Sequence, residues 1–155
     1  MLIMIKNQII FNKTFMVNLA EYSFGNLPQA IIIEIFKDGR PFSHFIEKWL
    51  MLNYELIHIG GCKSYDFVDS NDENIKYDQK TFTSRGCKFM PSNMIGEGRK
   101  FNKEIFEAKA RKLNYIIVSN VNFPEIKIKF VKGTDLINTY PNGTIPSKDL
   151  IKFFN

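Results

Sequence analysis

The chain contains 155 residues, of which 45% are hydrophobic and 24% are charged, and its net charge is +5. This composition excludes a disordered chain, and the length fits a single domain over residues 1–155. Two cysteines, Cys62 and Cys87, are too few for a disulfide scaffold, so we expect reduced thiols in a cytoplasmic protein. We expect neither a membrane helix nor a signal peptide. The positive charge favours a polyanionic partner.

The first part of the chain gives an ambiguous pattern. Residues 1–20 fit either a hairpin or a helix. Pro28 favours the start of a helix over residues 29–36 that ends at Asp38. The β-branched isoleucines of this segment also fit a buried strand, so both readings stay open.

The next segment predicts a helix followed by a strand. Ser43 is the expected N-cap of a helix over residues 44–53. Its apolar residues recur at helical spacing, which leaves Glu47 on the opposite, polar face. Residues 54–59 predict a strand, and two glycines after it allow a sharp bend.

Residues 65–83 predict a β-hairpin, because two strand-like runs flank a loop rich in Ser, Asn and Asp. Folding the segment about Asp72 places Asp66 opposite Asp78. Side chains alternate between the two faces of a strand, so Asp66, Asp78 and Lys80 share one face. The opposite face is apolar and consists of Tyr65, Phe67, Ile75 and Tyr77.

Two acids and a lysine on one face of a hairpin predict a divalent metal site. Neighbouring carboxylates repel each other unless a cation compensates their charge. Mg²⁺ is commonly held by one or two carboxylates together with water and substrate phosphate. Lys80 is on the side where it can orient an attacking water or stabilise charge on a phosphate. The alternative is an exposed hairpin with cross-strand ion pairs.

These residues resemble the motif of the PD-(D/E)xK nuclease superfamily, and within it the small type II restriction endonucleases. Asp66 matches the first acid of the motif, and Asp78-Gln79-Lys80 matches the acid-x-Lys triplet on the next strand. Ser64-Tyr65 stands where the motif commonly has a proline before the first acid. The motif is short, and the resemblance covers about residues 40–132.

The resemblance implies an α/β (α+β) fold with a restriction-endonuclease-like core, in which helices flank a mixed central β-sheet. It implies Mg²⁺-dependent, sequence-specific hydrolysis of double-stranded DNA by a homodimer. Asp66 and Asp78 would bind the metal with the backbone carbonyl of Gln79, and Lys80 would position the attacking water. The helix before the hairpin often supplies a further acid in this family, a role that Glu47 fits. The alternative for Glu47 is a solvated helix residue.

Residues 84–100 are basic, loop-like and rich in side chains that form directional hydrogen bonds. Long ordered loops beside an active site are often functional, and basic side chains contact phosphates or base edges. The alternative is a surface loop whose charges only keep the protein in solution. The chain has no phosphate-binding Gly-rich motif, so we expect no nucleotide cofactor. The residues expected to bind DNA are Arg85, Lys88, Asn93, Arg99 and Lys100.

The last third of the chain predicts structural elements. Asn102 is the expected cap of a helix with a buried stripe, and residues 115–119 predict a central strand covered on both faces. Residues 125–131 alternate apolar residues with lysines, which predicts a half-exposed strand whose lysines protect a sheet edge. Residues 141–146 predict turns, and residues 148–154 a short last helix.

Two other classes of protein stay open besides a sequence-specific endonuclease. One is a repair or junction-resolving nuclease of the same fold, which would recognise DNA shape. The other is a DNA-binding module without activity, in which the acids of the hairpin are surface charges.

Overall fold

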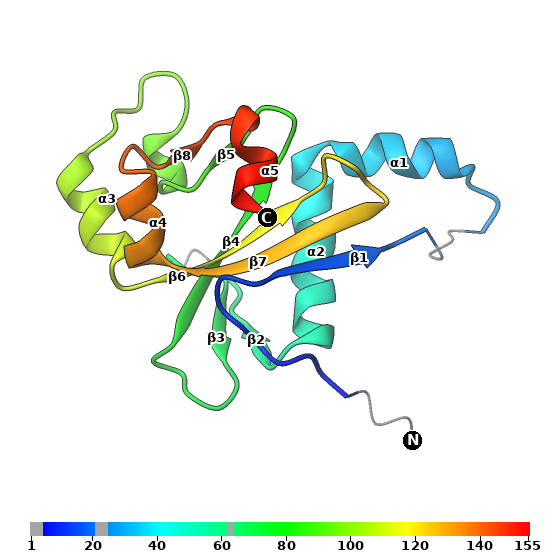
Figure 1. Ribbon diagram of the computed structural model, residues 1–155, viewed down its shortest axis with the longest axis horizontal. Helices are drawn as coiled ribbons and strands as arrows, with labels where there is room; N and C mark the ends of the chain where they lie inside the picture. The colour runs from blue at the N-terminus through cyan, green and yellow to red at the C-terminus, as the bar shows by residue number, and fades with distance from the viewer. Residues whose placement is uncertain (1–4, 21–24, 62–63) are drawn as a thin grey trace.

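The computed structural model describes residues 5–20, 25–61 and 64–155 (Figure 1). Within these residues the centre of the fold is a mixed, six-stranded sheet. In spatial order its strands are β1 (Thr14–Asn18), β7 (Glu125–Lys132), β6 (Asn114–Ser119), β4 (Lys76–Phe82), β3 (Phe67–Asp69) and β2 (Leu56–His58). The β4–β6 pair is parallel, and the other pairs are antiparallel.

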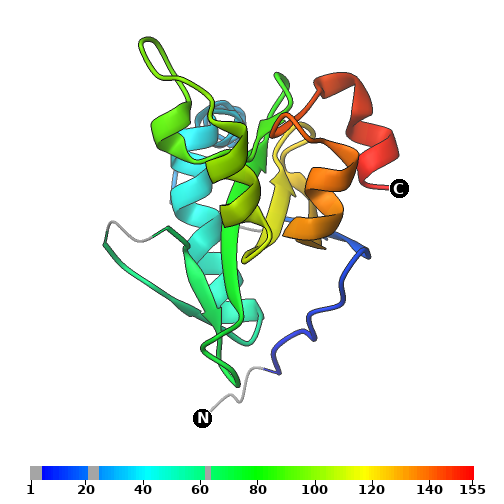
Figure 2. The same ribbon diagram turned by 90° about the vertical axis from the view of Figure 1, so that its left-hand side faces the viewer.

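Helices cover both faces of this sheet, so the expected mixed sheet flanked by helices is confirmed (Figures 1 and 2). One face packs against α1 (Gln29–Lys37) and α2 (Gly39–Asn53). The other face packs against α3 (Lys103–Ala110), α4 (Gly133–Thr139) and α5 (Leu150–Phe153). The second side also holds the small sheet of β5 (Cys87–Lys88) and β8 (Thr144–Ile145), with the 3-10 turns η1 (Ser92–Met94) and η2 (Ser147–Asp149).

The strand β6 divides the hydrophobic core into two clusters. Ile116 and Val118 belong to the cluster that packs against α1 and α2, called the α1–α2 cluster below. Tyr115 and Ile117 belong to the cluster that packs against α3, α4 and α5, called the α3–α5 cluster. All four side chains are buried, as expected for a strand that is covered on both faces. The predicted central strand over residues 115–119 is therefore confirmed.

The amino-terminal segment forms neither a hairpin nor a helix in its described part. Its strand β1 pairs antiparallel with β7, from Thr14 opposite Lys129 to Asn18 opposite Glu125. The alternation predicted for β7 is confirmed, but its lysines do not protect an edge, because β1 covers that side and is itself the edge strand. An alternating pattern identifies the buried face of a strand and says nothing about its neighbours.

The helix predicted over residues 29–36 is confirmed as α1, and α2 follows it after a single residue. Asp38 ends α1 and caps α2, since its Oδ1 accepts a hydrogen bond from the amide of Arg40 at 3.0 Å. The prediction that Ser43 caps the second helix is wrong. Ser43 lies inside α2, where its hydroxyl contacts the hydroxyl of Thr81 at 2.7 Å. Asp and Ser are comparable caps, so sequence preference alone did not separate them.

The carboxyl-terminal half contains elements that the sequence did not reveal. Asn102 caps α3 as predicted, accepting a hydrogen bond from the amide of Ile105 at 3.1 Å. The helix α4 was not predicted, and the strands β5 and β8 lie in segments expected to be loop and turns.

No helix within the described ranges is long and apolar enough to cross a membrane.

Candidate active site

The hairpin predicted around Asp72 is present as β3 and β4. Phe67 lies opposite Tyr77, and Val68 lies opposite Lys76. Phe67 and Tyr77 are buried in the α1–α2 cluster, which confirms that their face of the hairpin is apolar. Tyr65 was expected on the same face but packs against the α3–α5 cluster, because the chain is irregular before β3 begins.

Asp66 lies at this irregular position. Its amide donates to the carbonyl of Tyr77 at 2.9 Å, although Tyr77 already faces Phe67. Two residues of one strand thus face one residue of the other, as in a β-bulge, which changes the direction of a side chain. Asp66 is therefore not directly opposite Asp78 as predicted. Its carboxylate still reaches β4, because Oδ2 accepts a hydrogen bond from the amide of Gln79 at 2.8 Å.

The two hairpin acids interact strongly. The pKa of Asp66 is raised from 3.8 to about 7, first by burial and then by the charge of Asp78 and a hydrogen bond to it. The hydrogen bond from the backbone amide of Gln79 lowers the pKa of Asp66, but it offsets this rise only in part. Burial and the charge of Asp78 therefore favour the protonated form of Asp66, because like charges in a buried site do not both ionise readily.

Lys80 lies on the same side of β4 as Asp78. Its ammonium group forms an ion pair with the Asp78 carboxylate at 3.0 Å, and the two side chains are only 21% and 10% exposed. Among the described residues Asp66 has no such cationic partner. Lys80 therefore compensates the negative charge of Asp78 and leaves the charge of Asp66 uncompensated.

Glu47 projects from α2 toward the hairpin acids. Its Oε2 lies 3.0 Å from Nε2 of His58 on β2, and its side chain is 22% exposed. Its charge contributes to the raised pKa of Asp66, so the two carboxyl groups are neighbours. Glu47 is thus partly buried beside the hairpin acids, which does not fit the alternative of a fully solvated helix residue.

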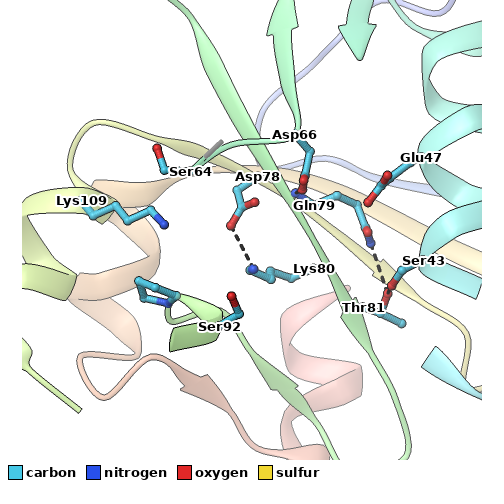
Figure 3. Close-up of a pocket in the computed structure, with 11 residues that line it drawn as sticks. Ser43, Glu47, Ser64, Asp66, Asp78, Gln79, Lys80, Thr81, Ser92 and Lys109 are labelled. Atoms are coloured by element: carbon cyan, nitrogen blue, oxygen red, sulfur yellow. Dashed lines mark hydrogen bonds and ion pairs between the residues drawn. The ribbon is translucent and has the colours of Figure 1, made fainter. Parts of the chain in front are cut away.

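These side chains line one polar pocket with a volume of about 330 Å³ (Figure 3). It opens where β4 continues past the end of β3, between α2 on one side and α3 with η1 on the other. Its lining residues are Ser43, Glu47, Ser64, Asp66, Asp78, Gln79, Lys80, Thr81, Pro91, Ser92 and Lys109.

A short hydrogen-bonded chain connects the wall of the pocket to α2. The side-chain amide of Gln79 donates to the hydroxyl of Thr81 at 3.3 Å, and this hydroxyl contacts that of Ser43 at 2.7 Å. The side chain of Gln79 is thereby turned to α2 and away from Lys80 (Figure 3). The expected metal ligand at this position is its backbone carbonyl, which these contacts leave unused.

The residues predicted to bind DNA do not gather in the pocket. All five are exposed. Arg85 lies in the turn after β4 and lines a second cavity with Lys37 and Arg40. The guanidinium group of Arg99 donates to the carbonyls of Ser92 and Ile95, at 2.7 and 3.2 Å, and so stabilises its own loop. Lys88 lies on β5, Asn93 on η1, and Lys100 follows Arg99 in the loop.

Sequence reasoning missed Lys109, Ser64 and Ser92, which the fold brings to the pocket. The helix α3 was expected to be mainly structural, because Phe106, Ala110 and Leu113 were predicted to form its buried stripe. Lys109 follows Phe106 by three residues, so it lies at the border of that stripe and is half-buried. No pattern in the sequence could have shown what this border faces.

Cys87 is buried beside the site but does not take part in it. Burial raises the pKa of its thiol to about 12, so the nucleophilic thiolate does not form at neutral pH. Cys62, the second expected thiol, lies outside the described residues.

The donor set fits a hard divalent cation with few protein ligands. Among the described residues no group of three His, Cys, Asp or Glu side chains is arranged to hold a metal. The two hairpin carboxylates are Asp66 and Asp78, and the pKa of Asp66 is raised by its burial and by the charge of Asp78. Mg²⁺ commonly takes one or two carboxylates and keeps several waters, whereas Zn²⁺ and Ca²⁺ use more protein ligands.

Comparison of the chain with protein-family models, with curated proteins and with solved structures gave no match.

Proposed function

We propose that this protein is a Mg²⁺-dependent endonuclease that hydrolyses phosphodiester bonds of double-stranded DNA at specific sequences, as a type II restriction endonuclease does. The observation that carries the proposal is the pair Asp66 and Asp78 in a polar pocket, with Lys80 in contact with Asp78 at 3.0 Å. Two carboxylates and one lysine at the end of a hairpin are the donor set that metal-assisted phosphodiester hydrolysis uses.

Each residue of the pocket has a role in this proposal. Asp66 and Asp78 would hold Mg²⁺, together with the backbone carbonyl of Gln79. The ion would supply a Lewis acid for phosphodiester hydrolysis. Lys80 positions the attacking water and offsets the negative charge that develops on the phosphate. Glu47, which contacts His58, adds a third carboxylate on the α2 side.

The order of elements supports a restriction-endonuclease-like core. A helix, three antiparallel strands, a second helix and a strand parallel to the third occur in the order α2, β2, β3, β4, α3 and β6, with β5 and η1 between β4 and α3. The short η1–α3 segment returns the chain to the pocket on the far side of β4. This order agrees with the mixed, helix-flanked sheet that the motif resemblance implies.

The charge of the molecule favours a polyanionic partner, and double-stranded DNA is one. The net charge of +5 is positive even though the pocket itself is rich in acids, so the excess of basic residues lies outside it. Arg85, Lys88, Asn93 and Lys100 are exposed and free to contact DNA on the side of η1 and the β4–β5 turn. Cleavage of both strands calls for two active sites, which a homodimer provides.

The test is incubation of the protein with phage DNA, with and without Mg²⁺, beside an Asp78→Asn variant. Glu34→Gln, an exposed carboxylate on α1, is the matched control. Discrete fragments that require Mg²⁺, disappear in Asp78→Asn and persist in Glu34→Gln support the proposal, and their ends give the recognition site. Sedimentation of the protein with a duplex that contains this site then tests the homodimer.

The same experiment separates the two alternatives. A smear of fragments indicates a nuclease that recognises DNA shape, or one that recognises no feature of the DNA. Either result contradicts the sequence-specific part of the proposal. Intact DNA in every lane, from protein with a folded circular-dichroism spectrum, contradicts the catalytic proposal and leaves a DNA-binding module.

A further inference from the structure

Lys109 is a cation of the pocket that the proposed mechanism does not use. It lies on α3, its side chain is half-buried, and its ammonium group points across the pocket toward Asp78 (Figure 3). Lys80 already forms the ion pair with Asp78 at 3.0 Å, and no ion pair of Lys109 is found in the described part of the chain. A partly buried lysine without an acidic partner has a charge available for a ligand.

The wall around Lys109 offers further hydrogen-bond donors. The hydroxyl groups of Ser64 and Ser92 lie on the same side of the pocket as Lys109, away from α2 (Figure 3). Neither hydroxyl forms a hydrogen bond with another described residue, whereas Ser43 and Thr81 on the α2 side bond to each other. This wall therefore presents an ammonium group and two hydroxyls, the combination that binds phosphate oxygens.

The charge of the pocket indicates what Lys109 contributes. The lining contains the three acids Glu47, Asp66 and Asp78 and the two lysines Lys80 and Lys109, so the ionised pocket has one excess negative charge. A divalent cation changes this excess to one positive charge, which a single phosphodiester neutralises. Without Lys109 the metal-loaded pocket would be neutral and would not attract the backbone of DNA.

We propose that Lys109 binds a backbone phosphate of the DNA strand in the pocket, with the hydroxyls of Ser64 and Ser92 as accompanying donors. This inference rests on the proposed function, because the phosphate belongs to its substrate. It assigns substrate binding to α3, opposite the α2 side that holds Glu47. Lys80 remains the lysine that acts on the attacking water, so the two lysines of the pocket have different tasks.

The test measures binding of a fluorescein-labelled DNA duplex by anisotropy at salt concentrations between about 50 and 200 mM, with Ca²⁺ in place of Mg²⁺. Each lysine–phosphate contact contributes about one to the slope of the logarithm of affinity against the logarithm of salt. In Lys109→Gln the slope becomes shallower by about one, and affinity at low salt falls about tenfold, the effect of one charge-assisted hydrogen bond. Lys109→Arg, which keeps the charge, retains the slope.

Lys112→Gln is the matched control, because Lys112 lies two residues after the end of α3 and is exposed. This variant leaves affinity within about twofold of the unmodified protein, as expected for a lysine outside the contact. Ser92→Ala removes a donor without a charge, so it weakens binding about threefold and keeps the slope. It also provides a test of the site if Lys109→Gln does not fold.

The outcomes separate this inference from the proposed function. A slope that is the same in Lys109→Gln, Lys112→Gln and the unmodified protein overturns the inference, even where the protein cuts DNA. Lys109-dependent binding by a protein that never cuts DNA supports the inference and contradicts the endonuclease. If Lys109→Gln does not fold, unchanged affinity in Ser92→Ala overturns the inference. Absence of any binding to the duplex overturns both.

Discussion

The two ends of the β3–β4 hairpin differ in what holds them together. At the loop end, Phe67 and Val68 pair with Tyr77 and Lys76, and the rings of Phe67 and Tyr77 are buried in the α1–α2 cluster. At the other end β4 continues past β3 and pairs only with β6 on its opposite side, so we call it the unpaired end. Here the amide of Gln79 bonds to a carboxylate instead of a carbonyl. Along the β3 side of β4, the paired end is thus stabilised by backbone hydrogen bonds and hydrophobic contacts, and the unpaired end by polar side chains.

This difference explains why the pocket lies where it does. A backbone amide that loses its strand partner needs another acceptor, because a buried unpaired donor is costly. Asp66 provides that acceptor, so its carboxylate is fixed beside β4 next to Asp78. The end of the ladder therefore creates both the space and the polar groups of the site, whereas the paired end supplies the rigid support.

The largest effect is expected at the paired end. Phe67→Ala removes a ring that is completely buried, so we expect the free energy of unfolding to fall by about 3–5 kcal/mol. Urea unfolding followed by circular dichroism measures this loss. Ser64→Ala, an exposed residue just before the hairpin, is the control and changes stability by less than about 0.5 kcal/mol. Equal stability of the two variants would contradict the role given to the paired end.

At the unpaired end the expected loss is in activity. Lys80→Met removes the ammonium group beside Asp78, so we expect the rate of DNA cleavage to fall about a hundredfold, or about 2.7 kcal/mol in the activation barrier. The measurement is single-turnover cleavage of a duplex at saturating protein. Lys148→Met, an exposed lysine on η2, serves as control. Cleavage by Lys80→Met at the unmodified rate would exclude a direct role for this lysine.

A smaller effect, on the pH dependence of stability, is expected for Asp66. Its pKa is about 7 in the folded protein and near 3.8 in the unfolded chain, so between these values the folded state binds more protons. The free energy of unfolding therefore falls as the pH rises from about 4 to about 7 without metal, by on the order of 2 kcal/mol after allowing for solvent exposure. Asp66→Asn removes this decline, because its side chain does not titrate.

Thermal unfolding across this pH range, with and without Mg²⁺, measures the effect. Mg²⁺ binds the ionised pair, so it restores stability at and above pH 7 in the unmodified protein and has little effect on Asp66→Asn. A flat pH profile for the metal-free protein would show that the two acids are not coupled as described. The unchanged response of Asp66→Asn to Mg²⁺ would exclude Asp66 as a ligand.

The smallest effect concerns the connection of the unpaired end to α2. Ser43→Ala removes the hydroxyl contact with Thr81 at 2.7 Å, so we expect a loss of about 0.5–1 kcal/mol in the free energy of unfolding. His44→Ala changes an exposed neighbour on the same helix and is the control. The comparison uses urea unfolding of both variants, and equal stabilities would indicate that the contact contributes nothing to the connection.

The sequence predicted the paired end better than the unpaired end, for a physical reason. Strand alternation and turn chemistry are local, so the register of Phe67 with Tyr77 followed from the loop centred on Asp72. The bulge at Asp66 depends on the contact of its amide with Tyr77 and on the bend before it, which no local pattern encodes. The face shared by Asp78 and Lys80 was nevertheless correct, because both lie on the regular strand β4.

The remaining site residues depend on long-range packing. Glu47 could be assigned to the polar face of a helix, but its contact with His58 requires α2 to cross β2. Lys109 and Ser92 reach the pocket only because β6 pairs in parallel with β4, which brings the intervening η1 and α3 back beside β4. A parallel pair needs such a crossover, and its position relative to the hairpin is set by the whole fold.

The pairing of β1 with β7 has a consequence for how the chain is made. These strands join residues 14–18 to residues 125–129, so the amino-terminal strand cannot complete its pairing until residue 129 has been synthesised. During that time the segment carries Phe15 and Val17 without the cluster that they later pack against. Contacts between such distant segments slow folding, because a long loop must close first. The edge of the sheet farthest from the pocket therefore depends on the pairing of two segments that are distant in the sequence.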